Sequence, residues 1–470
     1  MQTVLLGVRS MAVRLPRLTA LRVAWALLLV VTLWRFVDIA SFDVRDGPLA
    51  GDQANFVLQA QSLRHGANLS FDSEDLRRWS EFGWADKPYG LFYRATDDGW
   101  VFAKPYGYSA YLVPFMAVLG EARGIAVANG MLLAALIAVV VALLRLRMTG
   151  PVVPLVATAC VFASAAPFYG WVVHTEVFLA VLVGAACWLV IRHFDTGSYA
   201  SGLSAVIVVA FAFSEKATLA FVFAPVLLLM LVKLGNWRRR VGVVAVGGAA
   251  VLVFVSPYLW YSDGQHWNPY QGERYYSFGE VPFDGVSSAN DVRMKSADRN
   301  HYFSAEAFGR VGRAPEAIPQ SALTTVVGRH TGLLVFAPMS LIALAYTVRR
   351  WRDADQVARL LLAGTVAYLL LYVLLLPRFY VGGSSFGNRY FVQISTATVA
   401  VLVLSPMRSA TMIRAAVGSL MMSVVLLWPH HLAPRTTYSQ RLHVTTPLQR
   451  LLPGETQLGN WETFSGQPGD

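Results

Sequence analysis

The sequence has little charge and almost no cysteine. Only 14% of its 470 residues are charged, whereas 55% are hydrophobic, and the mean hydropathy is +0.48. This balance excludes a soluble protein with a hydrophobic tail and predicts a polytopic membrane protein. The two cysteines, Cys160 and Cys187, fall within apolar stretches. We therefore interpret them as small buried hydrophobes and expect no disulfide framework.

The sequence also lacks the usual signatures of metal binding and of nucleophilic catalysis. No group of His, Cys, Asp and Glu has the spacing of metal ligands. The adjacent His430 and His431 lie outside the expected centre. There is no Ser-His-Asp signature, no nucleophile elbow and no Walker loop. No tandem repeat or low-complexity tract occurs. We therefore expect no metal and no cofactor.

A net charge of +11 would suit a nucleic-acid-binding protein, but the positions of the basic residues argue otherwise. They cluster at the ends of apolar stretches, which is the positive-inside pattern of membrane proteins. This pattern predicts an orientation in the membrane and no nucleic-acid partner. The clusters are Arg14, Arg17 and Arg22; Arg145 and Arg147; Lys233 with Arg238, Arg239 and Arg240; and Arg349, Arg350 and Arg352.

Eleven apolar stretches have the length of membrane spans. If the N-terminus is cytoplasmic, every basic cluster lies on the same side, the first span is a retained anchor, and the C-terminus is outside. The stretch at 105–119 is interpreted as a helix on the outer surface, because counting it as a span would move Arg145 and Arg147 outside. The predicted fold is thus an all-α bundle of about 11 transmembrane helices. The spans lie near 21–40, 124–144, 151–171, 176–192, 199–214, 217–234, 241–261, 328–347, 357–377, 389–406 and 411–428.

Three outer segments are too long for simple turns, at 41–123, at 262–327 and from 429 onward. We therefore divide the chain into a membrane domain, 1–428, and a loose polar tail, 429–470. The second segment is rich in aromatic and polar residues, among them Trp267. Such aromatics either stack on sugar rings or form an interfacial belt.

Asp52 opens the amphipathic stretch GDQANFVLQAQSLRHG, which Gly66 ends. Locally, Asp52 is placed to cap a helix whose one face carries Phe56, Ala60 and Leu63. A carboxylate at the membrane surface also suits a base acting on lipid-borne substrates. The two roles are compatible, since a capping aspartate has a second oxygen.

Other ionisable residues gather at the outer ends of the predicted spans. His174 and Glu176 interrupt an apolar hairpin, which indicates either a functional site or an exposed turn. Glu215 and Lys216 occupy the next outward turn. They would either pair with each other or leave the lysine to hold a phosphate as a point charge.

A glycine-rich turn late in the chain carries two arginines, Arg378 and Arg389, together with Asn388. Glycine permits close backbone approach, and the planar guanidinium matches phosphate oxygens. The turn is thus a candidate phosphate site, with snorkelling towards headgroups as the alternative. His330 lies at the outer start of the eighth predicted span, next to Arg329.

These positions together resemble the GT-C superfamily of integral membrane glycosyltransferases. This superfamily includes protein O-mannosyltransferases, lipid A aminoarabinose transferases, and actinobacterial mannosyl- and arabinofuranosyltransferases. The resemblance covers about residues 20–410. It rests on the acid-led GDQANFVLQAQSLRHG, on KPYGYSAYLVPFMAVLGEAR, on HTE, and on GRHTGLLVFAP paired with YVGGSSFGNRYF. Gly51 is followed by Asp-Gln-Ala instead of the paired acids of some relatives, which argues against a metal-dependent reaction.

The resemblance implies an enzyme that moves one sugar from a polyprenyl-phosphate donor to an extracytoplasmic hydroxyl with inversion. Asp52 would be the general base and Glu176 a second acid in the same cavity. Lys216, His330, Arg378 and Arg389 would lie near the donor phosphate. The candidate substrate-binding residues are His174, Lys104, Tyr106, Asn388 and Trp267.

The expected partners are the lipid-linked donor, membrane lipids, and an acceptor that is a glycan, a glycolipid or a surface protein. The expected location is the inner or plasma membrane. Two other functions stay open. A lipid-linked sugar transporter or flippase would show inverted repeats and charges near the midplane. A ligase or polymerase would join preassembled lipid-linked glycans.

Overall fold

The computed structural model describes residues 2–46, 49, 51–84, 88, 91–97, 99–262, 269, 275–276, 295–296, 317–375, 387–432 and 446–453. The described chain is mostly helical and has little sheet, as expected for an all-α membrane protein. Of the two free cysteines, Cys187 is buried and Cys160 is partly buried, as expected for small hydrophobes.

Six helices among the described residues are long and apolar enough to cross a membrane. Each coincides with a span predicted from hydropathy, so the assignment to the multi-pass class is confirmed. They are the Leu21–Ala40 part of α1 (Gln2–Ala40), α5 (Glu121–Arg145), α7 (Glu176–Thr196), α10 (Trp237–Tyr261), α15 (Gln356–Leu375) and α18 (Ser409–Leu432).

Most of the remaining predicted spans coincide with shorter apolar helices, so the total of eleven stays a prediction. The predicted span at 328–347 is broken at Ala337. It contains α13 (Leu333–Phe336) and α14 (Pro338–Arg349), and it follows α12 (Ala317–Val327). The shorter apolar helices are α6 (Val152–Phe162), α8 (Tyr199–Glu215), α9 (Ala220–Lys233, preceded by η3, Ala217–Leu219) and α17 (Ser395–Leu404).

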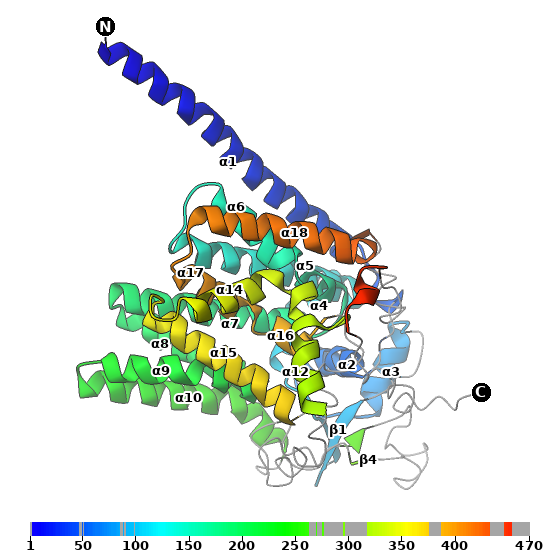
Figure 1. The fold of residues 1–470 in the computed structure, drawn as a ribbon. Coiled ribbons are helices and arrows are strands. Elements are labelled where there is room, and N and C mark those ends of the chain that lie inside the picture. Colours follow the sequence, from blue (N-terminus) through cyan, green and yellow to red (C-terminus); the bar gives the residue numbers. More distant parts are fainter. Residues whose placement is uncertain are drawn as a thin grey trace.

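The helices pack closely where small residues face a neighbouring backbone. A Cβ on Gly364 of α15 would lie 2.4 Å from the backbone oxygen of Val222 in α9, so glycine is needed for this approach. Small residues at such crossings are typical of membrane helices. Helix α7 packs against α5, α8 and α17. Figure 1 shows α8, α9, α10 and α15 lying side by side, while the first half of α1 projects beyond the bundle.

The chain reverses repeatedly between two ends of this bundle. We call the end with the α6–α7, α8–α9 and α15–α16 connections the site end, where α16 is Arg389–Val392. We call the opposite end the basic end, because the α5–α6, α7–α8, α9–α10 and α14–α15 connections meet there. In Figure 1 the basic end is to the left.

The first outer segment folds over the site end. It contains α2 (Asp52–His65), α3 (Ser73–Glu81), β1 (Phe92–Thr96), β2 (Gly99–Phe102) and α4 (Gly107–Leu119). Strand β1 pairs antiparallel with β2 and with β3 (Tyr275–Tyr276) of the second outer segment, and β3 pairs with β4 (Lys295–Ser296). The two outer segments therefore share one small sheet, which the sequence patterns did not predict.

Helix α4 occupies the stretch at 105–119 that was predicted to lie on the outer surface. Its Tyr108, Leu112 and Met116 are buried, and the helix packs against α2 and α5. Val118 at its far end is exposed. Its orientation relative to a membrane stays a prediction.

The described part of the C-terminal tail is not a loose extension. The backbone N–H of Arg329 donates to the carbonyl oxygen of Pro453 at 3.0 Å, and the Arg329 guanidinium donates to that of Arg450 at 2.7 Å. Residues 446–453 thus dock beside the turn that carries His330. The prediction of a loose tail was wrong for this part, because polar backbone groups there find partners.

Candidate active site

Asp52 is the first residue of α2 and does not cap it. The N-cap is Gly51, whose φ of 62° suits glycine, and no side chain caps this helix end. The capping role expected for Asp52 was therefore wrong by one position. Gly66 ends the helix as predicted, and Phe56 and Ala60 are buried. The Asp52 carboxylate is thus free to turn towards other segments.

Three basic side chains from separate segments contact the Asp52 carboxylate. Lys104 Nζ lies 2.5 Å from Oδ1, while His174 Nε2 and Arg389 Nη1 lie 3.1 Å and 3.2 Å from Oδ2. Burial alone would raise the pKa of Asp52, but Lys104, His174 and Arg389 together hold that pKa well below its usual range. Asp52 is therefore an ionised carboxylate within a largely buried ion cluster.

His174 joins Asp52 to Glu176. Its Nε2 faces Asp52, and its Nδ1 contacts a carboxylate oxygen of Glu176. Burial lowers the pKa of His174, but the two neighbouring carboxylates raise it above its ordinary value. His174 thus lies between the two acids, and its Nδ1 also accepts from the backbone N–H of Thr175 at 3.0 Å. Phe56 packs edge-on against this ring, with centroids 5.6 Å apart.

Glu176 is fully buried at the first residue of α7. Negative charge at a helix N-terminus is favourable because the unpaired N–H groups there carry partial positive charge. A second contact comes from Gln393, whose Nε2 lies 3.4 Å from Glu176 Oε1. The predicted pairing of Asp52 and Glu176 in one place is therefore seen, with His174 between them.

Arg389 begins α16 and points into the cluster. Its Nη1 lies 3.0 Å from His174 Nε2 as well as against Asp52, so the snorkelling alternative was wrong. Asn388 is the N-cap of α16, because its side chain accepts from the Phe391 N–H at 3.2 Å. Its expected role in substrate binding stays a prediction beside this structural role.

Gly387 positions this segment with a φ of 67° and donates its N–H to the His330 carbonyl oxygen at 3.1 Å. A Cβ on Gly387 would lie 2.7 Å from that of Ala165, so a side chain there would also clash. His330 thus contributes a backbone contact to the turn before Arg389. Arg378 and Trp267, also predicted for the site, lie outside the described residues.

Lys216 lies at the site end between α8 and η3. Its Nζ is 4.7 Å from the centre of the Tyr390 ring and 5.9 Å from that of Tyr372, which is favourable for a cation. Burial, with a smaller contribution from Arg389, lowers the pKa of Lys216 to about 7. Lys216 thus adjoins the Asp52 cluster through Arg389 and Tyr390.

Glu215 does not pair with Lys216, so that alternative was wrong. Its carboxylate accepts from the backbone N–H of Gly107 at 2.8 Å and of Tyr108 at 3.4 Å, at the start of α4. A Cβ on Gly107 would lie 2.6 Å from Glu215 Oε1, so glycine makes room for the carboxylate. Glu215 thereby fixes the segment that carries Lys104.

Besides its ion pair with Asp52, Lys104 has further contacts. Its backbone carbonyl accepts from Gln59 Nε2 of α2 at 3.0 Å, and its Nζ lies 4.1 Å over the Phe92 ring. Tyr106, two residues on, turns away from Asp52 and donates its hydroxyl to the Phe254 carbonyl of α10 at 3.0 Å. The structure thus brings Lys104 into the cluster but not Tyr106.

Sequence reasoning missed two glutamines that support the site. Gln53 Oε1 accepts from the Val173 N–H at 3.3 Å and thereby holds the backbone beside His174. Gln393 reaches Glu176 and also accepts from the Tyr368 hydroxyl at 3.0 Å. Gln393 is a polar residue within the apolar stretch at 389–406, and that isolation was a usable signal.

The cluster is rich in cations. Among the described residues, the basic side chains of Lys104, His174, Arg389 and Lys216 lie near the two acids Asp52 and Glu176. Such an excess favours an anionic ligand. Within the described ranges, no three or more His, Cys, Asp or Glu residues are grouped so as to hold a metal ion. Metal independence stays a prediction.

No protein-family model, curated protein or solved structure matches this chain. The resemblance to the GT-C superfamily therefore stays a hypothesis, and the candidate site is argued from its geometry.

Proposed function

We propose that this chain is a membrane glycosyltransferase of the GT-C type that uses a polyprenyl-phosphate-linked sugar as donor. One observation carries the proposal. Asp52 lies in a buried cluster with Lys104, His174 and Arg389, which come from segments far apart in the sequence. A carboxylate that can accept a proton thus adjoins cations that can hold a phosphate.

The cations supply the electrostatic part of the reaction. As the bond between the anomeric carbon and the phosphate oxygen breaks, the leaving phosphate keeps the electron pair and gains negative charge. Preorganised cations stabilise that charge without moving, which is often the largest contribution to catalysis. Arg389 offers a planar fork of donors, while Lys104 and Lys216 act as point charges.

Asp52 supplies the base. The acceptor hydroxyl oxygen attacks the anomeric carbon from the side opposite the phosphate, through an oxocarbenium-like transition state, and transfers its proton to Asp52. The products are the inverted glycoside and polyprenyl phosphate, with the proton on the carboxyl group. His174 Nε2 lies 3.1 Å from Asp52 Oδ2 and is placed to relay that proton.

Donor binding also explains how Asp52 becomes available. Lys104 contacts Oδ1 while His174 and Arg389 contact Oδ2, and a carboxylate held by such basic side chains is a weak base. A bound phosphate competes with Asp52 for Lys104 and Arg389. As these cations turn to the phosphate, the pKa of Asp52 rises and the carboxylate can accept a proton. The donor should therefore bind before the acceptor reacts.

The positive-inside rule orients the proposed enzyme. Arg147, Lys233 and Arg239 lie at the basic end, which the rule assigns to the cytoplasm. The Asp52 cluster would then face the extracytoplasmic side, where a donor made in the cytoplasm would be used after it has crossed the membrane. The small sheet made by both outer segments lies beside the cluster, since Phe92 of β1 packs against Lys104.

The decisive experiment incubates the purified protein with a panel of polyprenyl-phosphate sugars and candidate acceptors, and measures released polyprenyl phosphate. Asp52→Asn should lower the transfer rate about 10²–10⁴-fold, the usual contribution of a general base. Asp195→Asn, which removes an exposed aspartate at the basic end, is the matched control and should retain activity. Full transfer by Asp52→Asn would remove Asp52 from the mechanism. Movement of the lipid across vesicles without release would identify a transporter instead.

A further inference from the structure

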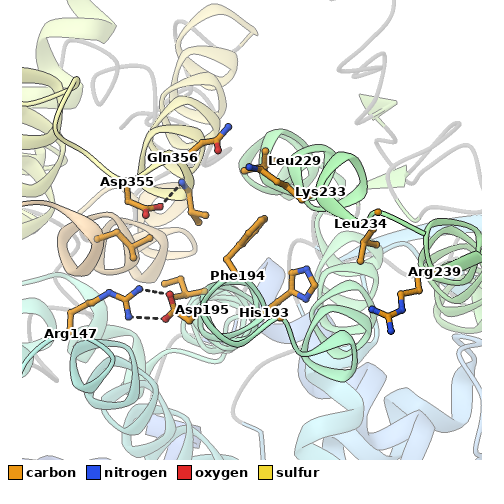
Figure 2. Close-up of a pocket in the computed structure, with 15 residues that line it drawn as sticks. Arg147, His193, Phe194, Asp195, Leu229, Lys233, Leu234, Arg239, Asp355 and Gln356 are labelled. Carbon is orange, nitrogen blue, oxygen red and sulfur yellow. Dashed lines mark hydrogen bonds and ion pairs between the residues drawn. The ribbon is translucent and has the colours of Figure 1, made fainter. Parts of the chain in front are cut away.

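A polar cavity lies at the basic end, away from the Asp52 cluster. Its volume is about 470 Å³, and it lies between the ends of α7 and α9 and the turn before α15 (Figure 2). Its floor is apolar, with Ile191, Leu234 and Val357 buried, whereas its rim is charged and exposed. The mechanism proposed above uses none of these residues.

The two acids of this cavity lie on one side, together with Arg147, and Arg239 lies on the other side (Figure 2). The acids are Asp195, which forms an ion pair with Arg147, and Asp355. Asp355 Oδ1 accepts from the Val357 N–H at 2.7 Å. Lys233 ends α9 and adds a third cation to the lining, after Arg147 and Arg239. A ligand that contacts both sides would carry an anionic and a cationic group.

The cavity adjoins a surface that suits lipid. Leu228 and Val232 of α9 are each 63% exposed, and Trp237 at the start of α10 is 67% exposed. Tryptophan is enriched where membrane proteins cross the headgroup level. Lys233 and Arg239 therefore lie where the phosphates of neighbouring lipids would be.

From this geometry we infer that the cavity binds a phospholipid with a zwitterionic, primary-amine headgroup. The phosphodiester would lie against Lys233 and Arg239, and the ammonium would donate to Asp195 and Asp355. An anionic lipid without an amine would leave both carboxylates without a new partner. A choline headgroup has no N–H to donate to them. The site therefore favours phosphatidylethanolamine over phosphatidylglycerol and phosphatidylcholine.

Native mass spectrometry of the purified full chain tests this selectivity with the three lipids added in turn. Phosphatidylethanolamine should show the highest occupancy. Arg239→Ala should lower that occupancy about tenfold, which corresponds to one lost charge-assisted hydrogen bond. Arg238→Ala is the matched control, because Arg238 stacks on Trp237 at 6.0 Å and does not line the cavity. It should bind the lipid as the unaltered chain does.

Asp355→Asn tests the contact to the ammonium group separately from the contact to the phosphate. It should reduce the preference for phosphatidylethanolamine over phosphatidylglycerol while the phosphate side stays intact. Equal losses in Arg239→Ala and Arg238→Ala would overturn the proposal, as would equal binding of the two lipids by the unaltered chain. If free glycerophosphoethanolamine competed as well as the lipid does, the ligand would be soluble and the lipid assignment would be wrong.

Discussion

The two ends of the bundle each contain an arginine–aspartate pair, and the surroundings of the pairs differ. At the site end, the Arg389 and Asp52 side chains are 19% and 17% exposed and share their contacts with Lys104 and His174. At the basic end, Arg147 and Asp195 are 40% and 31% exposed and form a two-pronged pair. The same residue types thus make a buried network in one place and a surface ion pair in the other.

This difference separates structural charge from functional charge. An exposed ion pair contributes at most about 1 kcal/mol and is screened by salt, so the Arg147–Asp195 pair forms at little cost in free energy and leaves Asp195 accessible to a ligand. Buried charges cost several kcal/mol each in lost hydration, and replacing such a network by apolar residues often stabilises a protein. A buried cluster around Asp52 is therefore poorly explained by stability alone, and it favours a functional site.

In the comparison of the two arginines, the largest effect is expected from Arg389→Lys. Arg389→Lys keeps the charge but loses the fork whose Nη1 reaches both Asp52 and His174, so transfer should fall about 10²-fold. Arg147→Lys should change transfer by about twofold at most, because its pair is exposed. Initial rates of polyprenyl phosphate release measure the transfer activity of both variants. Similar losses in the two variants would end the distinction between the two ends.

The sequence predicted most of the architecture. Six predicted spans coincide with long apolar helices, because burial in lipid requires runs of apolar residues that are visible in any sequence. His174, Glu176 and Arg389 were also found in advance, since ionisable residues that interrupt such runs are conspicuous. Their meeting with Asp52 followed only from the resemblance, because no local pattern encodes which span ends converge.

Other features could not be read from the sequence, for physical reasons. Strands β3 and β4 have two residues each, too few to show an alternating pattern. Asp52 was expected to cap α2, but the φ of 62° at Gly51 moves the cap by one residue. The partners of Glu215 are backbone N–H groups more than 100 residues away, and a side-chain pattern cannot reveal them.

A smaller effect is expected from replacing Glu215 or Asp355, whose carboxylates accept from backbone N–H groups at the start of a helix. Glu215→Ala leaves the Gly107 and Tyr108 N–H groups buried without this partner and should lower the free energy of unfolding by about 2 kcal/mol. Glu215→Gln keeps an acceptor and should lose less. Asp355→Ala removes a partly buried contact to the Val357 N–H and should cost about 1 kcal/mol.

Thermal or denaturant unfolding in detergent measures these losses, and donor transfer measures their consequence. Because Glu215 fixes the segment before α4, its loss should also raise the KM for the donor through Lys104. Asp355→Ala should leave that KM unchanged. If the two variants lowered stability and donor binding equally, Glu215 would have no special role in positioning Lys104.

The smallest expected effect is a pH dependence confined to the site end. Burial lowers the pKa of Lys216 to about 7, whereas the hydrogen bond to Asp195 raises the pKa of Arg147 and keeps it charged. Lys216 is thus protonated below about pH 7 and loses its positive charge as the pH rises. If it holds the donor phosphate, the KM for the donor should rise up to about tenfold between pH 6 and pH 8. Lys216→Arg stays charged throughout and should flatten this rise. A KM that rises equally in both proteins would assign the titration to another group.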